Sequence, residues 1–203
     1  MVRKQVRLKT QRRGLAFFLF ASFLTFAIVC YWNWILQREH ILFDRKFAVV
    51  KENVLFRSRI PTTSRLQEME RRCKIKTIVA LLNDDEVNQP EFGAEQNFAK
   101  QHDIKFIRLP MGVPTPEQVT KFLEIVNNPA NQPVLVHCWH GAIRTGVLVA
   151  IYRIKEQGWP LQKALDEMAF YGFDLQTTQY KSMLDIIRGY TSKTESSVTH
   201  TTN

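Results

Sequence analysis

The first 38 residues of this 203-residue chain contain no acidic side chain, and Glu39 is the first carboxylate. The formal net charge of +9 arises mostly there, because six basic residues between Arg3 and Arg13 leave only +3 for the remainder. No later basic stripe is interleaved with aromatic residues, so this charge does not indicate nucleic-acid binding. The basic excess belongs to an N-terminal tail, residues 1–14.

Cysteine is also scarce, since the chain has only Cys30, Cys73 and Cys138. There is no CxxC pair and no Cys/His spacing of the kind that binds zinc. The composition therefore predicts neither a disulfide framework nor a metal site, although a bridge between Cys73 and Cys138 stays open. With 45% apolar residues, the chain can bury the core of one domain.

Charged side chains are absent from residues 15–36, which read LAFFLFASFLTFAIVCYWNWIL. A helix of this length spans about 33 Å, enough to cross the hydrocarbon of a bilayer. Aromatic rings cluster at its far end, where the headgroup layer favours them. A cleaved signal peptide is the alternative, but it usually has a shorter apolar run and small residues at the cleavage site. The segment therefore predicts an uncleaved transmembrane anchor.

The basic residues that precede this segment also predict its orientation. Cytoplasmic flanks of membrane spans carry an excess of lysine and arginine. We therefore expect a single-pass membrane protein with a cytoplasmic N-terminus and its domain on the non-cytoplasmic side. Three basic residues follow the span, so the downstream flank is basic too.

The rest of the chain alternates between strand-like and helix-like patterns, which favours an α/β fold. We expect a linker over 37–52, a folded domain over 53–190 and a disordered polar tail over 191–203. The domain should contain a central, mostly parallel sheet of about four to five strands flanked by helices, in addition to the N-terminal transmembrane helix. Four short apolar runs predict its strands, at 53–58, 77–82, 105–110 and 133–138.

Helices are predicted between and after these strands. Thr115 and Gln118 have the spacing of a capping box, which marks a helix start. The segment from Ile143 reads as a largely buried helix that ends near Gly158. Pro160 opens another helix, and a last one is expected over 176–190.

The stretch VLVHCWHGAIRTGVLVA, residues 134–150, joins the fourth strand to the buried helix. A turn that leads into a helix N-terminus directs backbone N–H groups at one point, where the helix dipole also favours negative charge. Such a site binds phosphate and stabilises a thiolate, here that of Cys138. Arg144 adds a planar fork of donors that matches phosphate oxygens, and Gly141 lets the backbone approach the anion.

Within this stretch, HCWHGAIRTG resembles the H-C-x5-R-[ST]-G signature of the cysteine-dependent protein tyrosine and dual-specificity phosphatases. The segments FRSRIPT, KIKTIVALLNDDE and IRLPMGVPTPEQ are similar to the small atypical dual-specificity branch, including its bacterial members. The resemblance covers about residues 53–190. It implies a protein tyrosine phosphatase-like fold and a phosphomonoester phosphatase that uses no cofactor or metal.

The resemblance also implies roles for individual residues. Cys138 would form a cysteinyl-phosphate, and the Thr145 hydroxyl would assist the departure of its thiolate. His137 would hold the loop and tune the thiol. Phosphate would be bound by the loop itself, at Trp139, His140, Gly141, Ala142, Ile143 and Arg144. The alternative, a plain core cysteine next to a surface arginine, fits the combined pattern poorly.

An acid that protonates the leaving oxygen is missing from both positions where such phosphatases carry one. The loop LPMGVPTPEQ has no aspartate, and Ile143 stands before the arginine. Asp84 and Asp85 are the preferred substitutes. Three other carboxylates are candidates: Glu86, Glu117 and Asp174.

The substrate follows only in outline from these features. The signature loop contains no lysine, which disfavours a highly anionic head group, and the expected anchor favours a phosphorylated membrane protein or a phospholipid. We therefore predict a membrane-anchored phosphatase of phosphoproteins or phospholipids. The alternative is a weak or inactive pseudo-phosphatase that binds phosphate. The sequence does not define an oligomeric state.

Overall fold

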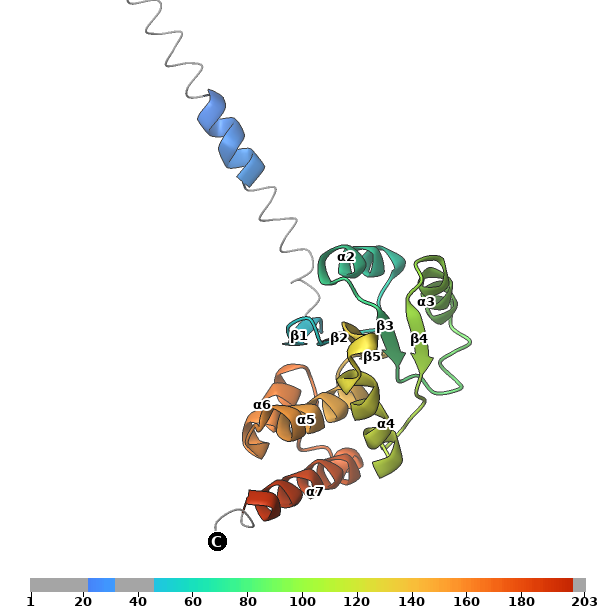
Figure 1. Cartoon of the computed structure of the whole chain (residues 1–203), viewed down its shortest axis with the longest axis vertical. Coiled ribbons are helices and arrows are strands. Elements are labelled where there is room, and N and C mark those ends of the chain that lie inside the picture. The colour runs from blue at the N-terminus through green and yellow to red at the C-terminus, as the bar shows by residue number, and fades with distance from the viewer. Residues whose placement is uncertain (1–21, 32–45, 199–203) are drawn as a thin grey trace, which may run out of the picture. The chain divides into compact units, whose positions relative to one another are not determined.

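The computed structural model describes residues 22–31 and 46–198, with side chains as far as Thr191. The chain divides into two compact units, Met1–Phe43 and Asp44–Asn203. All strands, and every helix from α2 onward, lie in the second unit, which is drawn with its labels in Figure 1.

The first unit contains the predicted membrane span, of which only residues 22–31 are described, as a helix. Ten residues of helix extend about 15 Å, half the thickness of a bilayer's hydrocarbon. Within the described part of the chain, no helix is both long and apolar enough to cross a membrane. The predicted single-pass localisation, with its orientation, is therefore wrong by this criterion. The remaining residues of the span lie outside the described ones.

The second unit is built on one five-stranded sheet in the order β1-β2-β5-β3-β4. Four strands are parallel, and only β1 is antiparallel to its neighbour β2. This confirms the prediction of a mostly parallel α/β sheet. The strands are β1 (Ala48–Lys51), β2 (Leu55–Arg59), β3 (Thr77–Ala80), β4 (Lys105–Arg108) and β5 (Val134–Cys138).

Helices cover both faces of this sheet (Figure 1). Side chains of α2 (Thr63–Cys73) and α3 (Pro90–Gln101) share one apolar cluster with Phe56, Ile78 and Leu135 of the sheet. The opposite face packs against a larger set of helices. These are α4 (Pro116–Asn127), α5 (Ile143–Gln157), α6 (Leu161–Phe170) and the start of α7 (Lys181–Val198). Two short 3-10 helices, Pro129–Asn131 and Thr178–Tyr180, complete the unit.

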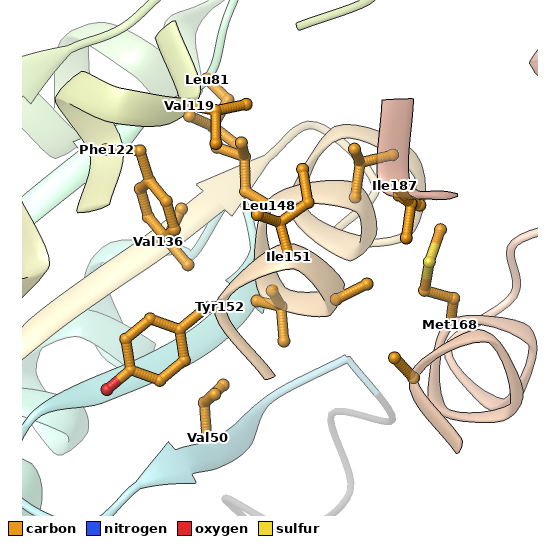
Figure 2. Close-up of a cluster of buried hydrophobic side chains, with 14 of the residues drawn as sticks. Val50, Leu81, Val119, Phe122, Val136, Leu148, Ile151, Tyr152, Met168 and Ile187 are labelled. Carbon is orange, nitrogen blue, oxygen red and sulfur yellow. The ribbon is translucent and has the colours of Figure 1, made fainter. Parts of the chain in front are cut away.

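Helix α5 is the centre of the larger core. Every residue from Thr145 to Ile154 is buried, as the continuous apolar run predicts. Figure 2 shows Leu148 and Ile151 of this helix between Val136 of the sheet and Met168 of α6. Burial of a side chain of this size contributes about 1.5–3 kcal/mol. The core therefore fixes α5 relative to β5, and with it the turn between them.

Several element boundaries differ from the sequence predictions. Strand β1 lies inside the predicted linker 37–52, and α7 continues to Val198, beyond the predicted start of a disordered tail. Pairing with β2 explains the first difference, because β1 alone has a weak pattern. The capping box at the start of α4 is present as predicted, with the hydroxyl of Thr115 accepting from the backbone of Gln118.

The topology places one end of β5 at a switch point of the sheet. The helix after β2 packs on one face, whereas the helix after β5 packs on the other. Crevices at the carboxyl ends of parallel strands arise where successive connections leave on opposite faces, and ligands bind there. Cys138 is the last residue of β5 and lies at this edge.

Candidate active site

The site is formed by the turn that joins β5 to α5. Strand β5 ends at Cys138, whose side chain is buried, and α5 starts five residues later at Ile143. Gly141 adopts a φ of +66°, and a Cβ there would lie 2.5 Å from the backbone nitrogen of Arg59 and 2.6 Å from the carbonyl of Ser58. Only glycine combines that conformation with so close an approach.

Neighbouring segments fix the carbonyl groups of the turn. The amide of Leu81 donates to the carbonyl of His137 over 2.8 Å, and the amide of Ile60 donates to that of Trp139 over 3.4 Å. Helix α5 begins without a side-chain cap. Its first N–H groups have no partner within the helix, as at any helix start, so they are available to an anion.

Arg144 lies in the first turn of α5 and is held by two acceptors. Its Nη1 donates to the carbonyl of Leu81 over 2.7 Å, and Nη1 and Nη2 donate to the two carboxylate oxygens of Glu86, each over 2.5 Å. These contacts use three of the five guanidinium protons. The remaining two, on Nε and Nη2, form the other edge of the group.

Electrostatics keep this arginine and its partner ionised. Burial lowers the pKa of Arg144, but Glu86 and Cys138 outweigh that effect and raise it above its ordinary value. The hydrogen bond from Arg144 lowers the pKa of Glu86, with a further contribution from the amide of Asn83, which donates to Glu86 over 2.8 Å. Glu86 is therefore a carboxylate that orients the arginine.

A second arginine, from the buried strand β2, hydrogen-bonds the backbone of the turn. Arg57 of β2 has no exposed surface, and its Nη2 donates to the carbonyl of Gly141 over 2.8 Å. Its guanidinium carbon lies 3.8 Å from the ring centre of Tyr171. Burial lowers the pKa of Arg57 to about 10, opposed by Glu167, Tyr171 and Cys138, so Arg57 stays charged near neutral pH.

The residue before Cys138 in β5 is a buried histidine, and it contacts a buried glutamate. Nε2 of His137 is 2.9 Å from Oε1 of Glu95 in α3, and neither side chain is exposed. The hydroxyl of Thr145 is buried as well and has no hydrogen-bond partner among the described residues. On the rim of the turn, His140 is exposed and Trp139 packs against an apolar cluster that includes Ile60.

Comparison with known proteins identifies the family. Residues 29–185 match a family described as a DSP-PTPase phosphatase fused to NAD+ kinase. The chain belongs to this phosphatase family. The resemblance to dual-specificity and tyrosine phosphatases is thereby confirmed, and it extends to curated and solved relatives.

Two curated relatives illustrate the similarity. The chain is 35% identical to inositol diphosphatase SIW14 of Saccharomyces cerevisiae over 149 residues, covering 70% of this chain and 50% of that protein. It is 32% identical to dual specificity protein phosphatase TpbA of Pseudomonas aeruginosa over 122 residues, covering 59% of this chain and 51% of TpbA. The chain thus spans about half the length of these relatives.

Solved structures agree with the fold. The core catalytic domain of SIW14, titled a PP-IP phosphatase in complex with citrate, superposes with a TM-score of 0.61 at 30% identity. That match covers 75% of this chain and 90% of the SIW14 domain. The structure of P. aeruginosa TpbA gives a TM-score of 0.57 at 25% identity, over 74% of this chain and 91% of TpbA.

Four of the five predicted acids have exposed side chains. Asp84 is exposed and pairs with Arg108, and Asp85 is exposed beside it. Glu117 is exposed and hydrogen-bonds the cap of α4, and Asp174 accepts from two residues that follow it. Of the five candidates, Glu86 contacts the signature turn, and it does so as the partner of Arg144.

Two buried residues of the site, Glu95 and Arg57, were not predicted, although each is a charged residue at a position where the pattern calls for an apolar one. Glu95 occupies a position three residues after Phe92 and three before Phe98, where the period of α3 requires an apolar side chain. Arg57 interrupts the apolar run of β2 in the same way. A charged residue at a core position is informative, because burial of a charge requires a partner.

The three cysteines are free thiols, so Cys73 and Cys138 are not bridged. Among residues 22–31 and 46–198, no three side chains of the histidine, cysteine or carboxylate type are grouped as metal ligands.

Proposed function

We propose that this chain is a cysteine-dependent phosphatase with Cys138 as its nucleophile. The carrying observation is that Arg144, oriented by Glu86, lies in the first turn of α5, and that this helix starts five residues after the buried Cys138. The thiolate attacks phosphorus, an S–P bond forms, and the P–O bond to the leaving group breaks. Water then attacks phosphorus and releases inorganic phosphate and the thiolate.

In this proposal, other residues of the turn bind the phosphate and stabilise the departing thiolate. Arg144 binds two equatorial oxygens through Nε and Nη2, and the amides from Trp139 to Arg144 bind the others. The buried hydroxyl of Thr145 stabilises the departing thiolate in the second step. The Glu95–His137 pair holds the strand end that carries the nucleophile.

The acidity of the leaving group should decide which substrates react fastest. Among the described residues, the carboxylate that binds the turn is Glu86, and its contact with Arg144 favours the ionised form, which cannot donate a proton. Leaving groups that are acidic enough to depart unprotonated should therefore react best. Phosphoric anhydrides satisfy this condition, because the leaving group is then a phosphomonoester, whose second pKa is about 6.

A diphosphate is therefore the substrate class that we favour, ahead of phosphotyrosine and phosphoserine. Similarity to a relative named inositol diphosphatase supports this choice. The turn has no lysine, but Arg59 is exposed and paired in register with Cys138, where it can meet further phosphates. The named protein phosphatase TpbA makes phosphotyrosine the second candidate.

The first experiment measures hydrolysis of p-nitrophenyl phosphate by the full chain, in reductant and EDTA, for the wild type, Cys138→Ser and Arg144→Lys. We expect turnover that both variants lose. An inositol diphosphate, a phosphotyrosine peptide, a phosphoserine peptide and a phospholipid monoester are then compared. The anhydride should exceed the serine ester by about 10²–10⁴-fold in kcat. Equal rates on both would contradict the leaving-group argument.

A phosphate-binding pseudo-phosphatase is the second candidate. It is favoured by the absence of a placed acid and by Glu86, which occupies one edge of Arg144. This function predicts that the wild type binds orthovanadate but hydrolyses neither p-nitrophenyl phosphate nor the diphosphate. Turnover that depends on Cys138 would exclude it.

A further inference from the structure

One row of side chains across the sheet is polar, although the rows before and after it are apolar. Ser58 of β2 and Ala80 of β3 both pair in register with His137 of β5, and the three side chains point to the face covered by α3. All three residues are fully buried. The neighbouring rows on this face consist of Phe56, Ile78 and Leu135 on one side and of Ile60 and Leu82 on the other. The polar groups of the row are thus enclosed between apolar layers.

The polar atoms of this row have few partners. Nε2 of His137 lies 2.9 Å from Oε1 of Glu95 in α3, which is ion-pair distance, but the two groups are not aligned as a hydrogen bond. Nδ1 of His137 and the hydroxyl of Ser58 are buried and have no hydrogen-bond partner among the described residues. The large majority of buried polar side-chain atoms in native proteins have such a partner. The ring is held on one side, and its second nitrogen needs a partner.

Ser58 is the residue of the row that can supply this partner. Adjacent strands lie about 4.8 Å apart, so a hydroxyl and an imidazole in register come within reach of each other when the hydroxyl occupies the suitable staggered rotamer. A hydroxyl can donate or accept, so the bond forms whichever ring nitrogen carries a proton. Apart from Glu95, the other described side chains with buried, unpartnered polar atoms belong to the opposite face: Arg57, Thr77 and Thr145.

Ser58 and His137 are both joined to the signature turn through the backbone. A Cβ at Gly141 would lie 2.6 Å from the carbonyl oxygen of Ser58, so the turn packs directly on this residue. His137 is followed by Cys138 at the end of β5. A bond between the two side chains therefore connects the wall of the turn to the strand end that carries the thiol.

We propose that Ser58 is a positioning residue of the phosphatase site: its hydroxyl hydrogen-bonds Nδ1 of His137, so that Ser58 and Glu95 hold the imidazole from two sides and fix Cys138 relative to the turn. This inference rests on the proposed function for its catalytic meaning. The hydrogen bond itself is independent of turnover and can be detected by spectroscopy.

The first experiment detects this bond by nuclear magnetic resonance. The full chain is labelled with 15N and 13C, and Nδ1 of His137 is assigned through the backbone resonances of that residue. We expect its 15N chemical shift to move in Ser58→Ala, because the nitrogen loses its hydrogen-bond partner. Thr77→Val is the matched control. It also removes a buried, unpartnered hydroxyl from the sheet, but on the opposite face, and should leave the shift in place.

The second experiment measures positioning by steady-state kinetics with p-nitrophenyl phosphate. Ser58→Ala should lower kcat about twofold to tenfold, the range of one neutral hydrogen bond, with KM close to wild type because Arg144 and the amides of α5 are untouched. Thr77→Val should retain wild-type kinetics. Glu95→Gln should lower kcat as well. Since Ser58 and Glu95 act on the same ring, the double variant should lose less than the product of the two single losses.

The outcomes separate this inference from the proposed function. An unchanged shift in folded Ser58→Ala, or an equal displacement in Thr77→Val, overturns the hydrogen bond whatever the turnover. An unchanged kcat in Ser58→Ala, or independent effects of Ser58→Ala and Glu95→Gln, overturns the positioning role. If Glu95→Gln does not fold, as judged by circular dichroism, Ser58→Ala and Thr77→Val decide the question. A wild type without turnover overturns the proposed function and the positioning role with it, but not the hydrogen bond.

Discussion

At the scale of the residue, Arg144 shows how one side chain serves the fold and a ligand at once. Its end-on edge is bound to Glu86 and its Nη1 also to Leu81, which fixes the plane of the guanidinium. In the proposed mechanism, the side-on edge, Nε and Nη2, binds two oxygens of the phosphate. The arginine is thus oriented before any ligand arrives.

Replacement of Glu86 by glutamine should weaken this orientation. We expect kcat/KM for p-nitrophenyl phosphate to fall roughly tenfold, the equivalent of one charge-assisted hydrogen bond, mainly through KM. Asp85→Asn, an exposed neighbour in the same loop, is the matched control and should retain wild-type kinetics. A wild-type KM in Glu86→Gln would show that the carboxylate does not position Arg144.

The same pair predicts a pH dependence of stability. Arg144 holds the pKa of Glu86 below its ordinary 4.5 in the folded chain. The stabilisation is therefore complete above pH 4.5 and is lost as the pH falls through the folded pKa. The difference in free energy of unfolding between wild type and Glu86→Gln should be constant from pH 5 to 7 and shrink towards pH 3, as measured by urea titration. A difference that grows on acidification would contradict the pairing.

Gly141 allows a prediction with a close internal control. Gly141 and Gly158 have nearly the same φ, +66° and +65°, but a Cβ at Gly158 meets nothing within 4 Å. Gly158→Ala should cost about 1–2 kcal/mol, the strain of the left-handed conformation alone. Gly141→Ala should cost about 1–3 kcal/mol more, because its Cβ meets the backbone of β2, and it should abolish turnover. Equal losses of stability in urea would refute the close approach.

At the scale of the element, α3 contributes to the site through a single side chain. Its buried face carries Phe92, Phe98 and Ala99, and Glu95 lies among them within contact of His137. Burial of a carboxyl group on this face costs free energy unless the group has a partner, and His137 is that partner. Helix α3 therefore fixes the end of β5 as well as covering the sheet.

Truncation of this acid should expose that role. Glu95→Ala leaves His137 buried without its partner, and we expect a loss of about 3 kcal/mol in the free energy of unfolding. Glu91→Ala, an exposed glutamate in the first turn of the same helix, should change stability by less than about 0.5 kcal/mol. Similar small effects for both, measured by denaturant unfolding, would mean that the buried pair is energetically neutral.

The elements also show what the sequence could and could not predict. Strands β2, β3, β4 and β5 follow from short apolar runs and the buried α5 from a longer one, and the Cys138–Arg144 turn follows from its motif. Strand β1 depends on its pairing with β2, which a local pattern does not contain, and the polar end of α7 lacks the apolar period from which a helix is predicted. Arg57 and Glu95 were missed for a related reason, since their partners lie more than 40 residues away in the chain.

At the scale of the whole molecule, the site and all three apolar clusters lie within Asp44–Asn203. We therefore expect the chain without residues 1–43 to fold cooperatively and to hydrolyse p-nitrophenyl phosphate with a kcat within about twofold of the full chain, since nothing in its core is removed. Circular dichroism and steady-state kinetics on both chains provide the comparison. An unfolded or inactive product would place an essential part of the site in the first unit.

The two edges of Arg144 have a consequence for the timing of the reaction. In the proposed mechanism, Glu86 and phosphate bind different edges of the same planar group, so neither has to leave for the other to enter. Association and release then need no exchange of partners at the arginine and little rearrangement around it. Exchange of phosphate should accordingly need no displacement of Glu86, and an arginine that is oriented in advance is suited to small phosphorylated substrates that bind and leave in rapid succession.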